Sequence, residues 1–204
     1  NNIIATLKER IEVLEEENAR QRTIIKEQQL IIEQQADKIA ALEKEREEYY
    51  NSIADMIWPI KVGNQRLTSR FGWRNDPFGL PTTEFHRGID IACPRGTPIY
   101  AVKDGVVTRA SWNGGYGNCV IIYHGGGVSS LYAHCDNATS TRPIYEVKVG
   151  DSVKQGQIIA YVGTTGRSTG YHLHFGIIDT GIAPHPQGGQ YHDPAEYLPE
   201  GYFK

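Results

Sequence analysis

Two short segments of this 204-residue chain carry ionisable side chains at even spacing. The first reads His86-Arg-Gly-Ile-Asp90 and the second reads His172-Leu-His174. Because side chains of a β-strand alternate between its two faces, residues at i and i+2, or at i and i+4, point the same way. We therefore expect each segment to be a strand with its ionisable side chains on one face and its apolar side chains on the other.

These side chains suit a zinc site. Catalytic zinc takes three N or O ligands from the protein and keeps a fourth position for water. Two imidazoles and one carboxylate from the two segments supply that number, with one histidine to spare. A lone histidine is usually a surface or hydrogen-bonding residue, but the count and phasing here favour a metal site. Strand geometry alone does not decide whether His172 or His174 binds the metal.

The residues around these motifs also match a known family. From about Leu67 to Leu198 the chain resembles the M23 zinc metallopeptidases of the lysostaphin and LytM type. The matching stretches are SRFGWRNDPF, HRGIDIACPRGTPIYAVKDGVV, GYGNCVIIYHGGG, LYAH, VKVGDSVKQGQIIAYVGTTGRSTGYHLHF and HDPAEYL. HxxxD and HxH alone are moderately specific, but in this order and context they are highly specific. The resemblance implies an all-β antiparallel, LytM-like catalytic domain of the duplicated hybrid motif type.

The resemblance also assigns roles to individual residues. His86 and Asp90 match the two zinc ligands of HxxxD, and His174 matches the third ligand, so one Zn²⁺ per chain is implied. His172 matches the first histidine of HxH, which in the family faces the water beside the metal without binding the metal. His134, in Leu-Tyr-Ala-His, matches the other catalytic histidine.

A few positions depart from the family pattern. Tyr171 stands where the family often has Pro, and Gly176 stands where it often has Glu. The segment 136–146 is longer than the usual connection after the catalytic histidine. None of these changes removes a ligand or a catalytic group, so they bear on substrate preference. We expect the segments 74–85 and 136–146 to bound the substrate groove.

By resemblance the chain is a zinc metalloendopeptidase that hydrolyses peptide cross-links of bacterial peptidoglycan. Such a polymer lies outside the cytoplasmic membrane, so an extracytoplasmic place of action is expected, in the cell envelope, in the periplasm or as a secreted protein. The sequence favours the stem cross-link over a glycine bridge only through the family. The competing hypothesis is a catalytically silent coiled-coil scaffold that binds peptidoglycan or activates a partner amidase.

Composition divides the chain in two. Residues 1–50 contain no Gly and no Pro, while all 22 Gly and all 10 Pro follow. The first part has 12 acidic and 8 basic residues and the remainder has 12 and 13, so no basic stripe indicates nucleic acid. No apolar run is long enough to span a bilayer. The chain begins at Asn1 without an initiator Met, which is compatible with a processed fragment and with a membrane anchor upstream.

The first part has the heptad pattern of a coiled coil. The a positions are Ile4, Ile11, Asn18, Ile25, Ile32, Ile39 and Arg46, and the d positions are Leu7, Leu14, Gln21, Gln28, Gln35, Leu42 and Tyr49. Ile at a with Leu at d favours a parallel homodimer, and a polar Asn at one a position fixes register. Three Gln at d, with Ile24 and Ile31 widening the stripe, leave open a trimer, another partner, or a helix folded back on the catalytic domain.

Proline and glycine then set the domain boundaries. Pro59 lacks an N–H group and should end the helix, which gives a coiled-coil segment at 1–57 and a peptidase domain at 58–204, with a core of about 67–198. Short β-rich runs at 99–101, 105–110, 120–124, 129–133, 158–162 and 172–178 alternate with Gly-rich turns and indicate antiparallel strands. Cys93, Cys119 and Cys135 are expected to be buried free thiols, although a Cys119–Cys135 bridge is conceivable.

Overall fold

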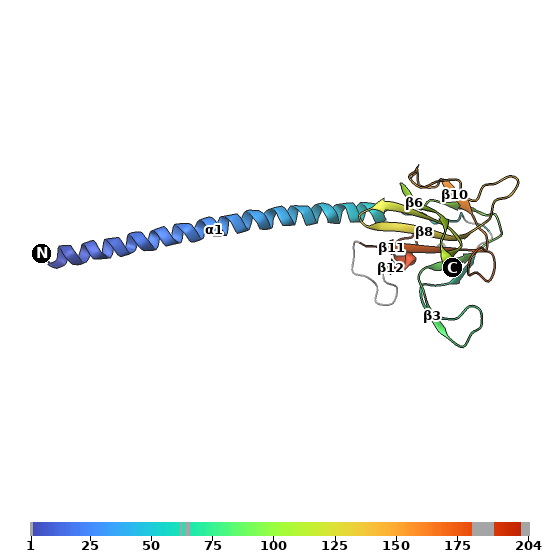
Figure 1. The fold of residues 1–204 in the computed structure, drawn as a ribbon, viewed down its shortest axis with the longest axis horizontal. Helices are drawn as coiled ribbons and strands as arrows, with labels where there is room; N and C mark the ends of the chain where they lie inside the picture. The colour runs from blue at the N-terminus through green and yellow to red at the C-terminus, as the bar shows by residue number, and fades with distance from the viewer. Residues whose placement is uncertain (1, 62, 64–65, 181–189, 201–204) are drawn as a thin grey trace. The chain divides into compact units, whose positions relative to one another are not determined.

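The computed structural model describes residues 2–61, 63, 66–180 and 190–200, and the chain divides into two compact units, 1–46 and 47–204. One helix, α1 (Asn2–Ile53), forms the whole described part of the first unit and enters the second (Figure 1). The prediction of a long N-terminal helix is confirmed. The helix ends at Ile53, before Pro59. Asp55, two residues later, has a φ of 58°, a left-handed conformation that does not continue the helix. The domain boundary at 57/58 stays a prediction.

The second unit is built on antiparallel sheets. Its largest sheet has the strand order β1-β4-β11-β8-β7-β6-β9, with β12 beside β11, and the smaller pairs are β2 with β3 and β5 with β10. The bounds are β1 Arg66–Ser69, β2 Gly72–Asn75, β3 Thr83–His86, β4 Ile89–Ala92, β5 Pro98–Tyr100, β6 Gly105–Trp112, β7 Asn118–Gly125, β8 Val128–Cys135, β9 Ser152–Val153, β10 Ile158–Tyr161, β11 His172–Asp179 and β12 Tyr191–His192; two 3₁₀ turns, η1 and η2, cover Gly114–Tyr116 and Pro194–Glu196.

All six β-rich runs predicted from the sequence are strands, with ends that differ by a few residues. The expectation of one strand from His86 to Asp90 is wrong. His86 ends β3 and Asp90 lies in β4, and these two strands belong to different sheets. Arg87 and Gly88 connect them. The motif therefore brings its two ligands together by a change of sheet rather than by strand alternation.

Side chains do alternate between the two faces within β4, which carries Asp90, and within β11, which carries His174. Ile89 and Ile91 of β4 flank Asp90, and Leu173 and Phe175 of β11 flank His174. These four apolar side chains are buried in the hydrophobic core, on the opposite face from the ligands. Burial of each such side chain is worth about 1.5–3 kcal/mol, so the core fixes both strands and hence the ligand face.

The last turn of α1 belongs to the packing of the second unit. Tyr49 and Ile53 pack on the core, and Met56 just beyond the helix is buried in it. At Gly126, in the turn between β7 and β8, a Cβ atom would lie 2.6 Å from the Cα of Tyr49, so glycine is needed for this close approach. The compact unit therefore begins before the helix ends.

The three cysteines are free and buried, which confirms the favoured prediction. Burial raises the pKa of the Cys93 thiol to about 11, and the pKa of Cys119 and of Cys135 is raised by the same cause. These thiols therefore stay protonated near neutral pH and pack as small apolar side chains.

Candidate metal centre and active site

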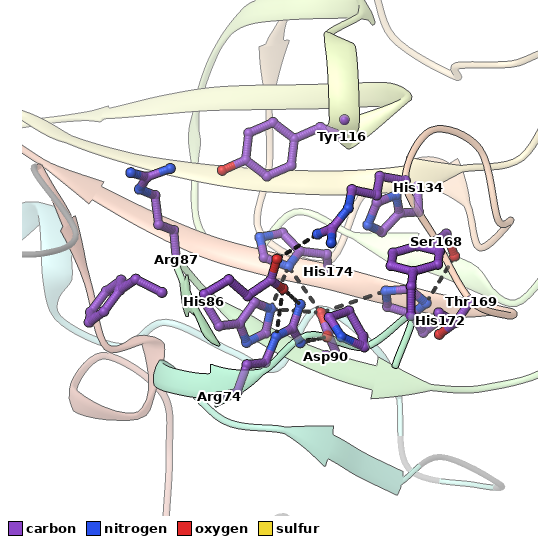
Figure 2. Close-up of a pocket in the computed structure, with 16 residues that line it drawn as sticks. Arg74, His86, Arg87, Asp90, Tyr116, His134, Ser168, Thr169, His172 and His174 are labelled. Atoms are coloured by element: carbon purple, nitrogen blue, oxygen red, sulfur yellow. Dashed lines mark hydrogen bonds and ion pairs between the residues drawn. The ribbon is translucent and has the colours of Figure 1, made fainter. Parts of the chain in front are cut away.

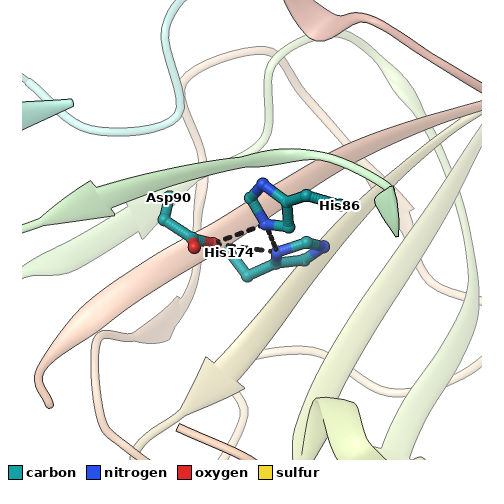
Figure 3. A group of neighbouring side chains, drawn as sticks. All are labelled: His86, Asp90 and His174. Carbon is teal, nitrogen blue, oxygen red and sulfur yellow. Dashed lines mark hydrogen bonds and ion pairs between the residues drawn. The ribbon is translucent and has the colours of Figure 1, made fainter. Parts of the chain in front are cut away.

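Three buried side chains from three strands converge on one point. His86 Nε2 lies 3.0 Å from Asp90 Oδ1 and 3.0 Å from His174 Nδ1, and His174 Nδ1 lies 3.0 Å from Asp90 Oδ1 (Figure 3). Register explains part of this convergence, because Asp90 of β4 and His174 of β11 are directly paired across the sheet. Opposed residues in an antiparallel pair hold their Cβ atoms about 4.5–5.5 Å apart.

The donor set fits a metal ion such as zinc. Among the described residues, His86, Asp90 and His174 each offer one ligand atom, and these atoms lie within 4.8 Å of one another. His86 Nδ1 lies 2.8 Å from the carbonyl oxygen of Arg70, so its N–H donates there and the Nε2 lone pair faces the cluster. His174 directs Nδ1 inward, and its buried Nε2 has no hydrogen-bond partner in the described part of the chain.

Gly88 permits the approach of β3 to β11. A Cβ atom at this position would lie 2.4 Å from the carbonyl oxygen of Phe175 and 2.9 Å from the ring of His174. Any larger residue would push the His86 strand end away from His174. The glycine of the HRGID motif is therefore required by packing, next to the ligands that it separates in sequence.

Arg74 of β2 supports the carboxylate ligand. Its Nη1 donates to Asp90 Oδ2 at 2.7 Å, while Oδ1 of the same carboxylate faces the two histidines. Burial alone would raise the pKa of Asp90, but its close contacts with His174 and His86 hold that pKa well below its usual range. Asp90 is therefore ionised near neutral pH, as a metal ligand must be.

We expect Arg74→Gln to weaken metal binding about 10–100-fold, the usual cost of losing a residue that orients a ligand. The metal affinity of Arg74→Lys should lie between those of the wild type and Arg74→Gln, because lysine keeps the charge and loses the planar guanidinium. Competition with a chromogenic chelator measures the metal dissociation constant. An unchanged constant in Arg74→Gln would show that Asp90 needs no support from Arg74.

Two further histidines face the same pocket (Figure 2). The ring of His134 lies 4.7 Å from that of His172 and 5.9 Å from that of His174, centroid to centroid. His134, the penultimate residue of β8, has a φ of 59°, a left-handed conformation that is uncommon for a residue other than glycine and that concentrates at functional sites. The structure thus brings together all five residues that the sequence singled out.

Each of these two histidines has one ring nitrogen fixed by the backbone. His134 Nδ1 donates to the carbonyl oxygen of Thr165 at 2.7 Å, and His172 Nδ1 donates to that of Gly170 at 2.9 Å. Burial, followed by repulsion from His172 and His174, lowers the pKa of His134 to about 4. At neutral pH His134 is therefore uncharged, with Nε2 able to accept a proton.

The pocket walls confirm one expected segment and correct the other. Arg74, Pro77, Phe78, Glu84 and Phe85 of the 74–85 segment line the pocket. Residues of 136–146 are not among its lining. The opposite side is formed instead by Gly115 and Tyr116 of η1 and by the loop residues 167–169. Closeness in sequence to His134 misled the prediction, because the strand ends at Cys135, one residue later, and Asp136 and Asn137 line another surface.

Arg167 ties the two walls together. Its Nη1 donates to Glu84 Oε2 at 2.6 Å, its Nη2 donates to Asp76 Oδ2 at 2.5 Å, and its guanidinium lies 4.6 Å from the centre of the Phe78 ring. Sequence reasoning placed Arg74 in the groove wall without a role for its side chain, and it missed Arg167, Arg87 and Tyr116. Their only sequence signal is that all four stand in the stretches that match the family.

Comparison with known proteins agrees with this geometry. Residues 84–187, about half of the chain, match Peptidase family M23. The DD-carboxypeptidase/endopeptidase Mpg of Neisseria meningitidis is 46% identical over 110 residues, 54% of this chain and 24% of that protein. Peptidoglycan DD-endopeptidase ShyC of Vibrio cholerae is 39% identical over 123 residues, 60% of this chain and 27% of that protein. The chain spans about a quarter of the length of these relatives.

Solved structures share the fold of the second unit. The catalytic domain of lysostaphin from Staphylococcus simulans superposes with a TM-score of 0.54 at 30% identity, over 66% of this chain and 92% of that domain. A zinc-containing peptidase from Vibrio cholerae superposes with a TM-score of 0.55 at 32% identity, over 67% of this chain and 37% of that one. The family match, the shared fold and the intact His-Asp-His cluster agree: this chain belongs to peptidase family M23.

Proposed function

We propose that this chain is a zinc metalloendopeptidase that hydrolyses peptide cross-links of bacterial peptidoglycan. One observation carries the proposal: the cluster of His86, Asp90 and His174 opens into a pocket where His134 and His172 stand beside it. Relatives named as peptidoglycan endopeptidases, and a similar structure named as a zinc-containing peptidase, support the substrate and the metal.

The proposed ligands are His86 through Nε2, His174 through Nδ1 and Asp90 through Oδ1. Zinc in such a site acts as a Lewis acid on a carbonyl group and lowers the pKa of water toward neutrality. With three protein ligands, a zinc ion held here would keep a fourth position for water.

The two remaining histidines are proposed to manage protons and charge. His134 and His172 hold their Nδ1–H groups on backbone carbonyls, so their Nε2 atoms face the pocket. One can take a proton from the attacking water and pass it to the leaving amine. The other can donate a hydrogen bond to the oxygen that becomes negative when the scissile carbonyl is attacked.

The substrate polymer lies outside the cytoplasmic membrane, so the proposal places the protein in the cell envelope. Among the described residues, no helix is long and apolar enough to cross a membrane.

Digestion of two peptidoglycan preparations tests the proposed activity. One preparation has direct stem cross-links without glycine bridges, and the other has pentaglycine bridges. Mass spectrometry of the soluble products is expected to show cleaved stem cross-links from the first. Products from the pentaglycine preparation alone would support the proposed metal-dependent hydrolysis and would show that the substrate is the glycine bridge. No product from either, with zinc bound, would favour the scaffold hypothesis.

We further propose that α1 forms a parallel homodimer. The apolar side chains at its a and d positions are exposed in the single chain, with exposed fractions of 42–63% for Ile4, Leu7, Ile11, Leu14, Ile25, Ile32, Ile39 and Leu42. A helix with one regular apolar stripe gains stability by burying it against another helix. A second copy of the chain offers the same stripe in the same register.

We expect the full chain to sediment as a dimer, and Ile25→Asp with Ile32→Asp to make it monomeric, because buried charges at two a positions disrupt the seam. A fragment for comparison should begin near residue 47 rather than at Trp58, since Tyr49 and Met56 pack with the core. That fragment should be monomeric and active. A monomeric full chain in analytical ultracentrifugation would contradict the dimer.

A further inference from the structure

Arg87 is the one charged side chain of the described pocket lining without an ionic partner in the structure. The other charged lining residues are engaged: Arg74 pairs with Glu84 and Asp90, and Arg167 pairs with Glu84 and Asp76. Arg87 is exposed, and its guanidinium lies over the ring of Tyr191, 6.0 Å from the ring centre.

The residues outside the described ranges have no carboxylate side chain that could pair with Arg87. Residues 1, 62, 64–65, 181–189 and 201–204 lie outside the described ranges, and their sequence contains no Asp or Glu. Arg87 lines the pocket, and among the described residues its guanidinium has no carboxylate partner, so its planar set of N–H donors is available. Such an unpaired fork is suited to bidentate binding of a carboxylate.

The position of Arg87 relates this charge to the reacting centre. Arg87 directly follows the proposed ligand His86, and its carbonyl oxygen would lie 3.0 Å from a Cβ atom at Gly176 of β11, so its backbone runs tightly along that strand. Consecutive Cα atoms are only about 3.8 Å apart, which places Arg87 within one or two substrate residues of the proposed metal site.

A hydroxyl group stands beside the same end of the pocket. Figure 2 shows the phenol of Tyr116 extending toward the Arg87 side of the site, and its ring lies 5.3 Å from that of His174. Burial, followed by the neighbouring Tyr191, raises the pKa of Tyr116, so the phenol keeps its proton. Among the described lining residues, the Arg87 end of the pocket thus has a guanidinium and a phenol and no carboxylate side chain without a partner.

We propose that Arg87 determines substrate specificity by binding a free carboxylate of the peptide within two residues of the scissile bond. The inference rests on the proposed function and narrows it. Stem peptides carry carboxylates on side chains and at chain ends, whereas the interior of a glycine bridge carries none. The unpaired guanidinium therefore selects an acidic stem cross-link over a neutral glycine peptide.

A set of synthetic cross-linked stem peptides tests this inference in the full zinc-loaded protein. Each peptide has one carboxylate converted to its amide, which separates a side-chain carboxylate from a terminal one. The value of kcat/KM is measured for the parent and for each amide with wild type, Arg87→Gln and Arg87→Lys. Arg66→Gln is the control, because Arg66 is an exposed arginine on β1 outside the pocket lining.

In the wild type, amidation of one particular carboxylate is expected to lower kcat/KM about 10–100-fold, the usual value of a hydrogen bond to a charged group. In Arg87→Gln, kcat/KM should fall by the same factor for the parent peptide and should hardly change for that amide. For the parent peptide, kcat/KM of Arg87→Lys should lie between those of the wild type and Arg87→Gln. Equal cleavage of all peptides by the wild type, or an equal loss on parent and amide in Arg87→Gln, would overturn the inference. Cleavage of none of the peptides by the wild type would instead overturn the proposed function.

Discussion

Replacing His86, Asp90 or His174 by alanine is expected to empty the metal site and to abolish peptide hydrolysis. Each side chain supplies one of three ligand atoms that lie within 4.8 Å of one another, so two donors would remain. Two protein ligands are too few for a stable catalytic zinc site. Elemental analysis should fall from about one zinc per chain to nearly none, and the release of peptide products should fall with it.

A matched control is available in His124. This histidine lies outside the pocket, with Nδ1 bonded to the carbonyl oxygen of Asp104 and Nε2 2.8 Å from Ser130 Oγ. His124→Gln should keep its zinc and its activity in proportion to the folded fraction seen by circular dichroism. Full zinc content in any one of the three ligand variants would show that the ligand set is wrong.

Replacing His134 or His172 by alanine should separate catalysis from metal binding. Neither side chain belongs to the three-atom cluster, so each variant is expected to keep about one zinc. The loss of general acid–base help typically costs about 10²–10⁴-fold in rate. We expect kcat for a cross-linked peptide to fall by that amount in each single variant.

The double variant provides a further check. In the proposed mechanism one of these two histidines acts on the water and the leaving amine, and the other acts on the oxygen that becomes negative. Both act in the same reaction, so their effects should not add fully. The fold loss in kcat of the double variant, His134→Ala with His172→Ala, should be much smaller than the product of the fold losses of the two single variants. If His172→Ala instead loses its metal, then His172 and His174 must exchange roles as ligand and catalyst.

Much of the site could be predicted from the sequence because its chemistry is concentrated in short motifs. His172 and His174 lie on one face of β11 as alternation requires, and Leu173 between them is buried. Strand alternation also predicted the correct face for Asp90. It was wrong that Asp90 and His86 lie close together because they share one strand, since they lie in β4 and β3. A turn at Arg87–Gly88, where any Cβ would contact β11, interrupts the strand and has no periodic signal.

The pocket walls could not be predicted because they depend on contacts between distant segments. Arg167 and Glu84 are far apart in sequence and bonded in the fold, and Tyr116 reaches the site from a short 3₁₀ turn. The strands β2 and β3 have four residues each. β2 alternates between half-buried and exposed residues, and β3 passes from an exposed to a buried residue, so neither has a clear apolar pattern. Tertiary ion pairs, rather than local propensity, place this hairpin beside the ligands.

Titration of zinc into chelator-stripped protein tests the central claim most directly, with cleavage of a stem cross-linked peptide followed by mass spectrometry. We expect no cleavage by the stripped protein, a rise in rate in proportion to added zinc, and a plateau at one zinc per chain. Cleavage that is unchanged by stripping, or a chain with one zinc bound that cleaves no peptide cross-link, would show that the chain is not a zinc endopeptidase.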